Sequence, residues 1–286
     1  MKILYFKKDG QHRLGIVSAA GILDIDAYLA SEGEAPLSAK PLSNAVVAAI
    51  RQKIAGTEIP ALYYLDENAL ELAPCTPSPS KIICIGLNYR KHAAESGMPV
   101  PVIPVVFTKY NNTLVDYGAP VPLGKVGVQF DYEVELGVVI GARCKNADKS
   151  SALDYVLGYC VANDMSCRDL QFRTSQWLMG KSLDHFLPLG KCLVTKDEIP
   201  DVQQLQLTCL LNGELRQNSS TADMIFTVAE IIADLSMHMT LEPGDLILTG
   251  TPEGVIMGMA EKNWLKPGDI VTVAIEHLGQ TTNTMA

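Results

Sequence analysis

The stretch FDYEVELGVVI, residues 130–140, decides the fold because it combines a buried strand with a row of carboxylates. Its second half is an unbroken run of β-forming residues that ends at Gly141, and such a run predicts a central strand covered on both faces. In its first half, Asp131, Glu133 and Glu135 occupy alternate positions. Side chains alternate between faces along a strand, so these three carboxylates are predicted to point the same way.

Carboxylates on one face of a buried strand need positive charge nearby, since converging acids raise one another's pKa. The alternative is a solvated face, or an edge strand that carries charges against aggregation. The apolar continuation of the strand argues against this, and so does Asp164, which ends a second apolar run, LGYCVAND, residues 157–164. We therefore expect a divalent cation bound through oxygen, with Mg²⁺, Mn²⁺ or Ca²⁺ favoured over zinc.

The stretch GLNYRKHAAESG, residues 86–97, contains a candidate general base. His92 and Glu95 are three residues apart, so on a helical turn they share a face, and the carboxylate can orient the imidazole and raise its basicity. The same spacing also occurs on ordinary helix surfaces. A glycine before the pair and the proline-rich GMPVPVIP after it predict a mobile lid over residues 86–104.

Two further stretches contain candidate site residues. In MGKSLDHFLPLG, residues 179–190, Lys181 lies in a turn of small residues, where the ordinary interpretation is a solvent-exposed lysine. In LTGTPEGVIMG, residues 248–258, Thr251 lies between glycines that would let the backbone approach a ligand closely. This second stretch lacks the Gly-Lys-Ser/Thr ending of a phosphate-binding loop.

The chain is predicted to be an α+β protein, mostly β, in two parts. Residues 1–74 predict a small α/β module with three short strands and a helix near SNAVVAAIRQKI, for which Ser43 is the N-cap. The segment 72–81, LAPCTPSPSK, is a linker candidate. The larger body, residues 81–286, has many strands and one convincing helix, TVAEIIADLSMHMT, with a capping box formed by Thr227 and Glu230.

Composition limits the partners and the compartment. The chain has 23 Lys and Arg against 32 Asp and Glu, a net charge of −9, which argues against nucleic acid or an anionic membrane as a partner. A small anionic substrate needs only one local cation or metal. No signal-peptide core and no apolar run of about 18 residues occurs. The seven cysteines contain no CxxC pair, so buried reduced thiols in a cytoplasmic protein are expected.

Taken together, these motifs resemble the fumarylacetoacetate hydrolase family, most closely its acylpyruvate-hydrolase-like branch. Six pieces match in the family's order across residues 81–258: GLNYRKHAAE, PVVFTKY, DYEVELGVVIG, VANDMSCRDLQ, GKSLDHFLPLG and LTGTPEGV. The resemblance implies a mixed β-roll in the second domain and a homodimer. The first 75 residues match only as the small N-terminal module that many members carry.

By motif position, the resemblance also implies roles for nine site residues and for one neighbour. The metal ligands for Mg²⁺ or Mn²⁺ would be Glu133, Glu135 and Asp164, with Asp131 as a hydrogen-bonding neighbour. The catalytic pair on the lid would be His92 and Glu95, and Lys181 would stabilise developing negative charge. The positions that contact substrate in the family are occupied here by Arg168, Gln171 and Thr251.

The activity implied is hydrolysis of a carbon–carbon bond in a β-diketo acid, such as an acylpyruvate or fumarylpyruvate, to pyruvate and a carboxylic acid. The partner would be a small 2-oxo acid. The family's shared motifs leave open decarboxylation of oxaloacetate and hydration or isomerisation of a 2-oxo-4-enoate. Two expectations of other classes also remain, a non-catalytic metabolite-binding protein and a salt-bridged protein interface.

Overall fold

The strand β10, Val134–Ile140, lies in the middle of the largest sheet, and every one of its residues is buried. The computed structural model describes residues 1–286, and it confirms the predicted central strand. The prediction is wrong for the start of the stretch, because Phe130–Asp131 forms a separate short strand, β9. The strand is interrupted where the N–H groups of Glu133 and Val134 donate to the side chains of Asn163 and Gln217, at 3.0 and 2.9 Å.

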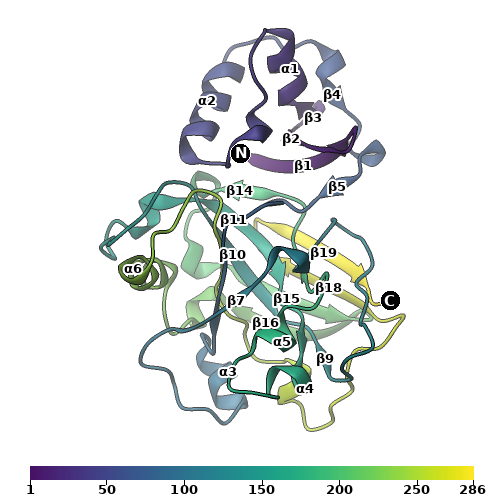
Figure 1. The fold of residues 1–286 in the computed structure, drawn as a ribbon, viewed down its shortest axis with the longest axis vertical. Helices are drawn as coiled ribbons and strands as arrows, with labels where there is room; N and C mark the ends of the chain where they lie inside the picture. Colours follow the sequence, from purple (N-terminus) through teal and green to yellow (C-terminus); the bar gives the residue numbers. More distant parts are fainter.

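The largest sheet has 11 strands and spans the molecule (Figure 1). Their order is β4-β3-β2-β1-β14-β11-β10-β17-β6-β7, with β5 beside β1. The strands β17 and β6 run parallel, whereas β10 is antiparallel to both of its neighbours, so the sheet is mixed as predicted. The bounds are β1 Lys2–Lys8, β2 Gln11–Ser18, β3 Gly21–Asp24, β4 Tyr64–Leu65, β5 Leu72–Ala73, β6 Ile82–Gly86, β7 Val105–Lys109, β11 Val156–Asn163, β14 Leu193–Thr195 and β17 Leu246–Leu248.

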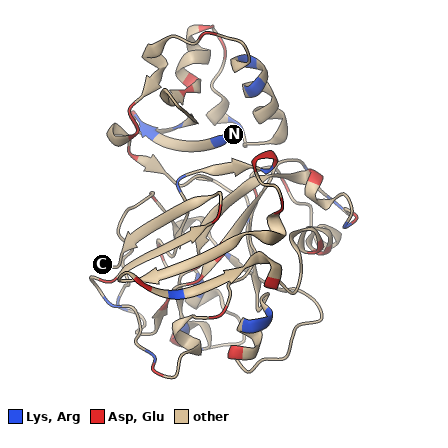
Figure 2. Ribbon diagram, turned by 180° about the vertical axis from the view of Figure 1, so that it is seen from behind, with Lys and Arg blue, Asp and Glu red and all other residues tan.

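The other strands form a four-stranded sheet and two short pairs. The four-stranded sheet has the order β16-β15-β18-β19, and the pairs are β12 with β9 and β13 with β8. Their bounds are β8 Leu114–Val115, β12 Ser166–Cys167, β13 Leu187–Pro188, β15 Gln206–Leu211, β16 Glu214–Ser220, β18 Ile270–Ile275 and β19 Gly279–Thr284. Seen from behind, the long strands of the body carry few charges (Figure 2), and β15, β18 and β19 contain none.

The helices are few and short, as the sequence predicted for the body. They are α1 Ile25–Ser31, α2 Asn44–Ile54, α3 Arg90–Glu95, α4 Arg168–Gln171, α5 Leu178–Lys181 and α6 Val228–His238. Both predicted N-terminal caps are confirmed: Ser43 accepts from the N–H of Val46, and Thr227 and Glu230 form a capping box. No helix has the length and apolar character needed to cross a bilayer.

The N-terminal module and the body share the large sheet. The strands β1 to β3 and helix α2 form where predicted, and the module stands at one end of the molecule (Figure 1). Strand β1 pairs with β14 of the body, and the linker begins as β5, which also pairs with β1. The sheet therefore continues from the module into the body. A domain boundary at residues 74–81 stays a prediction.

The two faces of β10 have different surroundings, and this difference positions the site. The side chains of Val134, Leu136, Val138 and Ile140 belong to the main hydrophobic core, together with residues of α6, β15 and β18. The side chain of Val139 belongs to a second core shared with the N-terminal module. Glu135 lies on the Val139 face, because side chains alternate along a strand.

Candidate active site

Three of the predicted carboxylates converge at the start of β10. Oxygen atoms of Glu133, Glu135 and Asp164 lie within 4.8 Å of one another, and all three residues are buried. The antiparallel register of β10 and β11 pairs Glu135 with Ala162, and the N–H of Asp164 donates to the carbonyl of Glu133 at 2.9 Å. Neighbouring strands therefore bring together acids that lie 29–31 positions apart in the chain.

Three buried cationic side chains contact these acids. The Nζ of Lys181 lies 2.6 Å from Glu133 Oε2 and 2.7 Å from Asp164 Oδ2. The Nζ of Lys109 lies 2.6 Å from Asp164 Oδ1, and Nη2 of Arg168 lies 2.6 Å from Glu133 Oε1. The protein itself therefore supplies much of the positive charge that the sequence argument assigned to a metal ion.

Glu135 is the carboxylate that none of these cations contacts. Its Oε2 accepts from the N–H of Gly250 at 2.8 Å. Burial, together with the nearby charges of Asp164 and Glu133, raises the pKa of Glu135 well above its usual range. Glu133 behaves oppositely: burial alone would raise its pKa, but Lys181 and Arg168 lower it to about 2. Positive charge is therefore still missing beside Glu135.

The residues present fit a divalent cation. With Asp131 included, four buried carboxylates face the three cationic side chains, which leaves one negative charge. All three converging groups offer carboxylate oxygens, the donors that Mg²⁺ and Mn²⁺ prefer. A divalent ion held by Glu133, Glu135 and Asp164 would supply the charge missing beside Glu135 and leave one positive charge for an anionic substrate.

Asp131 lies outside the three-carboxylate cluster and binds the backbone of a neighbouring loop. Its two oxygens accept from the N–H groups of Ile256 and Met257, at 2.8 and 3.0 Å. It also contacts the guanidinium of Arg168 at 2.9 Å, which in turn contacts Glu133. Asp131 is therefore linked to the three-carboxylate cluster through Arg168, and its role beside a metal stays a prediction.

His92 and Glu95 form the expected pair on α3. The distance from His92 Nδ1 to Glu95 Oε2 is 3.1 Å, and Glu95 Oε1 accepts from the N–H of Gly254 at 3.0 Å. A Cβ at Gly258 would lie only 2.3 Å from Glu95 Cδ. Gly258 therefore makes room for the carboxylate of Glu95, whereas the sequence had suggested that glycines of this stretch make room for a ligand.

The N-terminal end of the predicted lid is well anchored. The side chain of Asn88 donates to the carbonyls of Phe226 and Thr249 and accepts from the N–H of Phe226. Arg90 donates to the carbonyls of Asp223 and Met224. Beyond α3, in contrast, the segment 98–103 exposes several apolar side chains. The mobility of residues 86–104 stays a prediction.

Eight of the nine predicted site residues line one cavity of about 470 Å³. The ninth, Asp164, is fully buried and contacts the cavity-lining Lys181. The rest of the lining is largely apolar and includes Phe107 and Trp177, whose rings meet edge to face with centroids 5.2 Å apart. The eight residues are His92, Glu95, Glu133, Glu135, Arg168, Gln171, Lys181 and Thr251.

The three predicted substrate contacts have polar atoms that already bind protein groups. The hydroxyl of Thr251 donates to the carbonyl of Val134 at 3.0 Å and accepts from Gln217 at 2.9 Å. Arg168 Nη1 donates to Gln171 Oε1 at 2.9 Å. All three residues line the cavity, and their contact with substrate stays a prediction.

Sequence reasoning missed three residues that organise the site. Lys109 pairs with Asp164, while Asn163 and Gln217 bind the backbone at the start of β10. Lys109 had a weak signal, because it lies in the largely apolar run PVVFTKY, and a charged residue that becomes buried needs a partner of opposite charge. The two amides had none, since nothing local distinguishes them from surface residues.

The family model for the fumarylacetoacetate (FAA) hydrolase C-terminal domain matches residues 81–286. A Burkholderia cenocepacia protein that carries only a provisional hydrolase name is 45% identical over 283 residues, covering 98% of this chain and 97% of its own. The match therefore includes the N-terminal module as well as the body.

Three solved structures align over the whole of this chain. Fumarylacetoacetate hydrolase from Exiguobacterium antarcticum is 32% identical with a TM-score of 0.79, covering 100% of this chain and 99% of its own. At the same coverage, maleylpyruvate hydrolase from Sphingobium sp. SYK-6 is 28% identical with a TM-score of 0.76. The 5-carboxymethyl-2-hydroxymuconate delta-isomerase from Mycobacterium smegmatis is also 28% identical, at the same coverage, with a TM-score of 0.77. The chain belongs to the fumarylacetoacetate hydrolase family.

Proposed function

We propose that this protein is a Mg²⁺- or Mn²⁺-dependent hydrolase that cleaves a carbon–carbon bond of a β-diketo acid, giving pyruvate and a carboxylic acid. The observation that carries the proposal is the shared cavity, in which the His92–Glu95 pair and the carboxylates of Glu133 and Glu135 line the same space. A base and a candidate metal site facing one ligand are what hydrolysis of a 2-oxo acid requires. The maleylpyruvate hydrolase among the similar structures supports this reaction class.

The ion would be held by Glu133, Glu135 and Asp164. When bound, it supplies Lewis-acid polarisation of the oxygens at the pyruvate end of the substrate. The chain's own residues prepare that place: Lys181 and Arg168 hold the carboxylate of Glu133 between them, and Lys109 holds Asp164 from the buried side. These contacts limit the movement of both acids before a ligand arrives.

His92 is the proposed general base. Its Nδ1 faces Glu95, and donation from Nδ1 to that carboxylate leaves Nε2 unprotonated and able to accept a proton from water. Glu95 is held in turn by the N–H of Gly254, so the imidazole has one preferred orientation. A positioned base of this kind contributes about 10²–10⁴-fold to the rate.

Cleavage follows from attack at the distal carbonyl. The oxygen of the deprotonated water bonds to the acyl carbon, the bond from that carbon to the pyruvate unit breaks, and its electron pair leaves with the pyruvate carbon. Protonation of that carbon completes pyruvate, and the acyl part leaves as a carboxylate. Lys181, which lines the cavity with its Nζ 5.1 Å from the ring centre of Phe107, is the proposed stabiliser of the developing negative charge.

Isomerisation of an unsaturated 2-oxo acid is the second candidate. The delta-isomerase from Mycobacterium smegmatis is as similar in sequence as the maleylpyruvate hydrolase, at 28% identity each. Both reactions begin at the same 2-oxo acid end, and a base near the ligand serves either. Glu95 orients the imidazole of His92, and this favours hydrolysis, because isomerisation needs no activated water.

A panel assay tests the proposal directly. Acetylpyruvate, fumarylpyruvate, oxaloacetate and a 2-oxo-4-enoate are each incubated with the protein and Mg²⁺ or Mn²⁺, with and without a chelator. We expect chelator-sensitive formation of pyruvate and a carboxylic acid from the two acylpyruvates. Turnover of oxaloacetate or the enoate alone would replace the proposed reaction with decarboxylation, hydration or isomerisation, and no turnover at all would favour a metabolite-binding protein.

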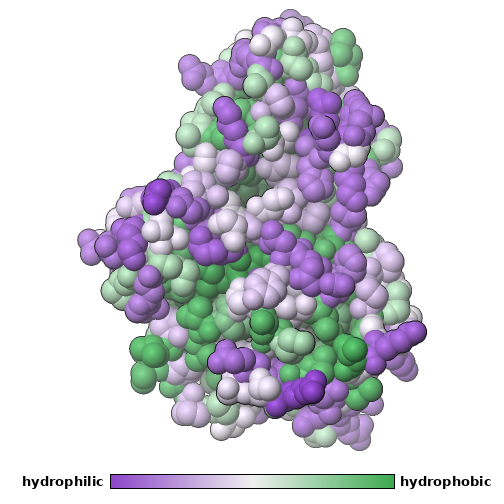
Figure 3. Space-filling model, in the orientation of Figure 1, coloured by the Kyte–Doolittle hydropathy of each residue, from purple (hydrophilic) through white to green (hydrophobic).

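We also propose a homodimer in a reducing, cytoplasmic setting. All seven cysteines are buried and unpaired, which supports the setting. Apolar surface gathers on the larger body (Figure 3). Strand β7 ends the large sheet and exposes Val106, and Val102, Ile103 and Tyr110, which lie outside the strand, are also exposed. An edge strand that no other strand covers, with exposed apolar side chains on and beside it, favours burial against a second copy. Light scattering of the purified protein measures the mass, and a monomeric mass would contradict the dimer.

A further inference from the structure

The proposed active-site cavity has a polar floor and an apolar outer wall. At the floor, Glu133, Glu135 and Lys181 are at most 5% exposed. The remaining lining includes Met257 and Met259, which are half-buried, with further apolar side chains from Met98, Phe172 and Trp177. The volume of about 470 Å³ lies within the range of roughly 300–1,000 Å³ for small-molecule sites. A pyruvate unit at the floor would leave much of this space to the acyl chain.

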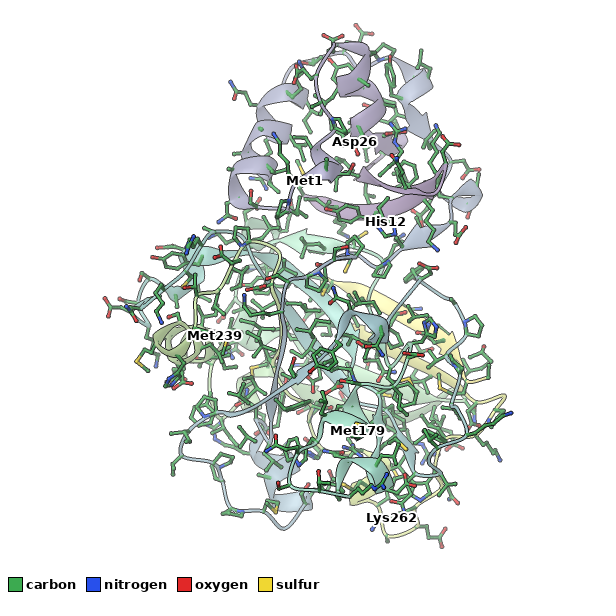
Figure 4. All side chains as sticks on the ribbon, in the orientation of Figure 1. Met1, His12, Asp26, Met179, Met239 and Lys262 are labelled. Carbon is green, nitrogen blue, oxygen red and sulfur yellow. The ribbon has the colours of Figure 1, made fainter.

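One segment of the chain lines the cavity from its floor to its mouth. It starts at Thr251, which is 3% exposed, continues through the half-buried Met257 and Met259, and reaches the exposed Lys262. Asp131 holds the middle of this segment by accepting two of its backbone N–H groups. Lys262 lies at the end of the body remote from the N-terminal module (Figure 4). Its ammonium group therefore belongs to the solvent end of the cavity.

Lys262 differs from the other basic residues of the cavity because it has no partner. Arg168 and Lys181 are paired with buried carboxylates, and His92 faces Glu95. Lys262 also lines the cavity, yet it makes neither a salt bridge nor a side-chain hydrogen bond. With a divalent ion held by the three carboxylates, the net positive charge at the floor would match the carboxylate at the pyruvate end of a substrate. The unpaired charge at the mouth would match a second anionic group.

We propose that Lys262 is a specificity-determining residue, which selects 2-oxo acids whose distal end carries a second carboxylate. This inference rests on the proposed function only in placing the 2-oxo acid end of the ligand at the floor. The acyl chain then lies along the methionine-rich wall, and its terminal carboxylate reaches the ammonium group at the mouth. The flexible stem of lysine presents a point charge rather than a rigid fork, so dicarboxylates of somewhat different length are accepted.

Equilibrium binding of two six-carbon probes tests this selection. 2-Oxoadipate and 2-oxohexanoate have the same 2-oxo acid end and chain length, but only the first has a distal carboxylate, and neither has the β-diketone needed for cleavage. Calorimetric titration of the Mg²⁺-loaded protein should give a Kd for 2-oxoadipate about five- to tenfold lower than for 2-oxohexanoate, which lies between the effect of an exposed ion pair and that of a hydrogen bond to a charged group. The difference should shrink in 0.5 M NaCl, because salt screens exposed charges.

The matched variants are Lys262→Gln and Lys266→Gln. Lys266 is an exposed lysine four positions further on that does not line the cavity. We expect Lys262→Gln to bind both probes with similar Kd values at low and high salt, and Lys266→Gln to keep the wild-type preference. A wild-type protein without preference, or a Lys262→Gln variant that keeps it, would overturn the inference. Because binding needs no turnover, failure to cleave acylpyruvates would refute the proposed reaction and leave this result standing.

Discussion

Replacing Glu135 with glutamine should make the protein insensitive to divalent ions without weakening its fold. Glutamine keeps the size of the side chain and can still accept from the N–H of Gly250, as Glu135 Oε2 does. It removes a buried charge that no cationic side chain contacts. Burial and the charges of Asp164 and Glu133 raise the pKa of Glu135, so at pH 7 its ionised form opposes folding. The metal-free variant should therefore unfold at the same temperature as the wild type or a higher one.

The stabilisation that a bound metal ion provides should be smaller in the variant than in the wild type. An ion at a hundredfold its Kd stabilises the wild type by about 2.7 kcal/mol, which corresponds to a rise in Tm of roughly 4–5 °C for a chain of this size. Glutamine leaves two carboxylates in the cluster. If the loss raises the Kd a hundredfold, the same ion concentration stabilises the variant by only about 0.4 kcal/mol, or about 1 °C.

Thermal unfolding followed by circular dichroism measures both effects, with Mg²⁺ and Mn²⁺ in separate titrations and a chelator as the metal-free state. Glu214→Gln is the control, because it removes one exposed acid whose partner is Arg216 and should keep the full metal-dependent shift. Equal shifts in wild type and Glu135→Gln would refute the assignment of Glu135 as a ligand. A metal-free variant that unfolds well below the wild type would refute the argument from uncompensated charge.

Three further perturbations follow from the contacts of the site and of α6. His92→Ala should retain the metal-dependent rise in Tm but lose turnover of acylpyruvates by about 10²–10⁴-fold; unchanged turnover in a steady-state assay would place the base elsewhere. Lys109→Met leaves Asp164 without one of its two buried cations. The free energy of unfolding, measured in urea, should therefore fall by about 3–5 kcal/mol. A loss below 1 kcal/mol would contradict the pairing of Lys109 with Asp164. Hydrogen bonds from Lys149 and from the N–H of Thr227 lower the pKa of Glu230 to about 2. The ionised carboxylate of Glu230 therefore stabilises the fold above the unfolded-state pKa near 4.5, and this stabilisation is lost as the pH falls toward 2. Glu230→Gln should therefore cost about 1 kcal/mol at pH 7 and less at pH 3.5, and a cost independent of pH would show that its charge is not involved.

The candidate site could be predicted from the sequence wherever its pattern was local. The alternate positions of Glu133 and Glu135 and the spacing of His92 and Glu95 depend only on backbone periodicity. In the structure the members of each pair lie close together, although Glu133 comes directly before β10 and not within it. The same holds for the capping box of α6. The prediction of one strand over residues 130–140 was wrong at its start, because the N–H groups there bind the side chains of Asn163 and Gln217.

What the sequence by itself determined was therefore the alternate acids, the His92–Glu95 pair and the central strand, since each follows from periods of two or of about 3.6 residues. Only the tertiary structure decided how the acids are neutralised. Lys109 and Lys181 reach Asp164 from 55 and 17 positions away, and Lys262 reaches the same cavity without a partner. Charge compensation depends on distance in space, and that distance is set by strand register and loop course, which no local period encodes.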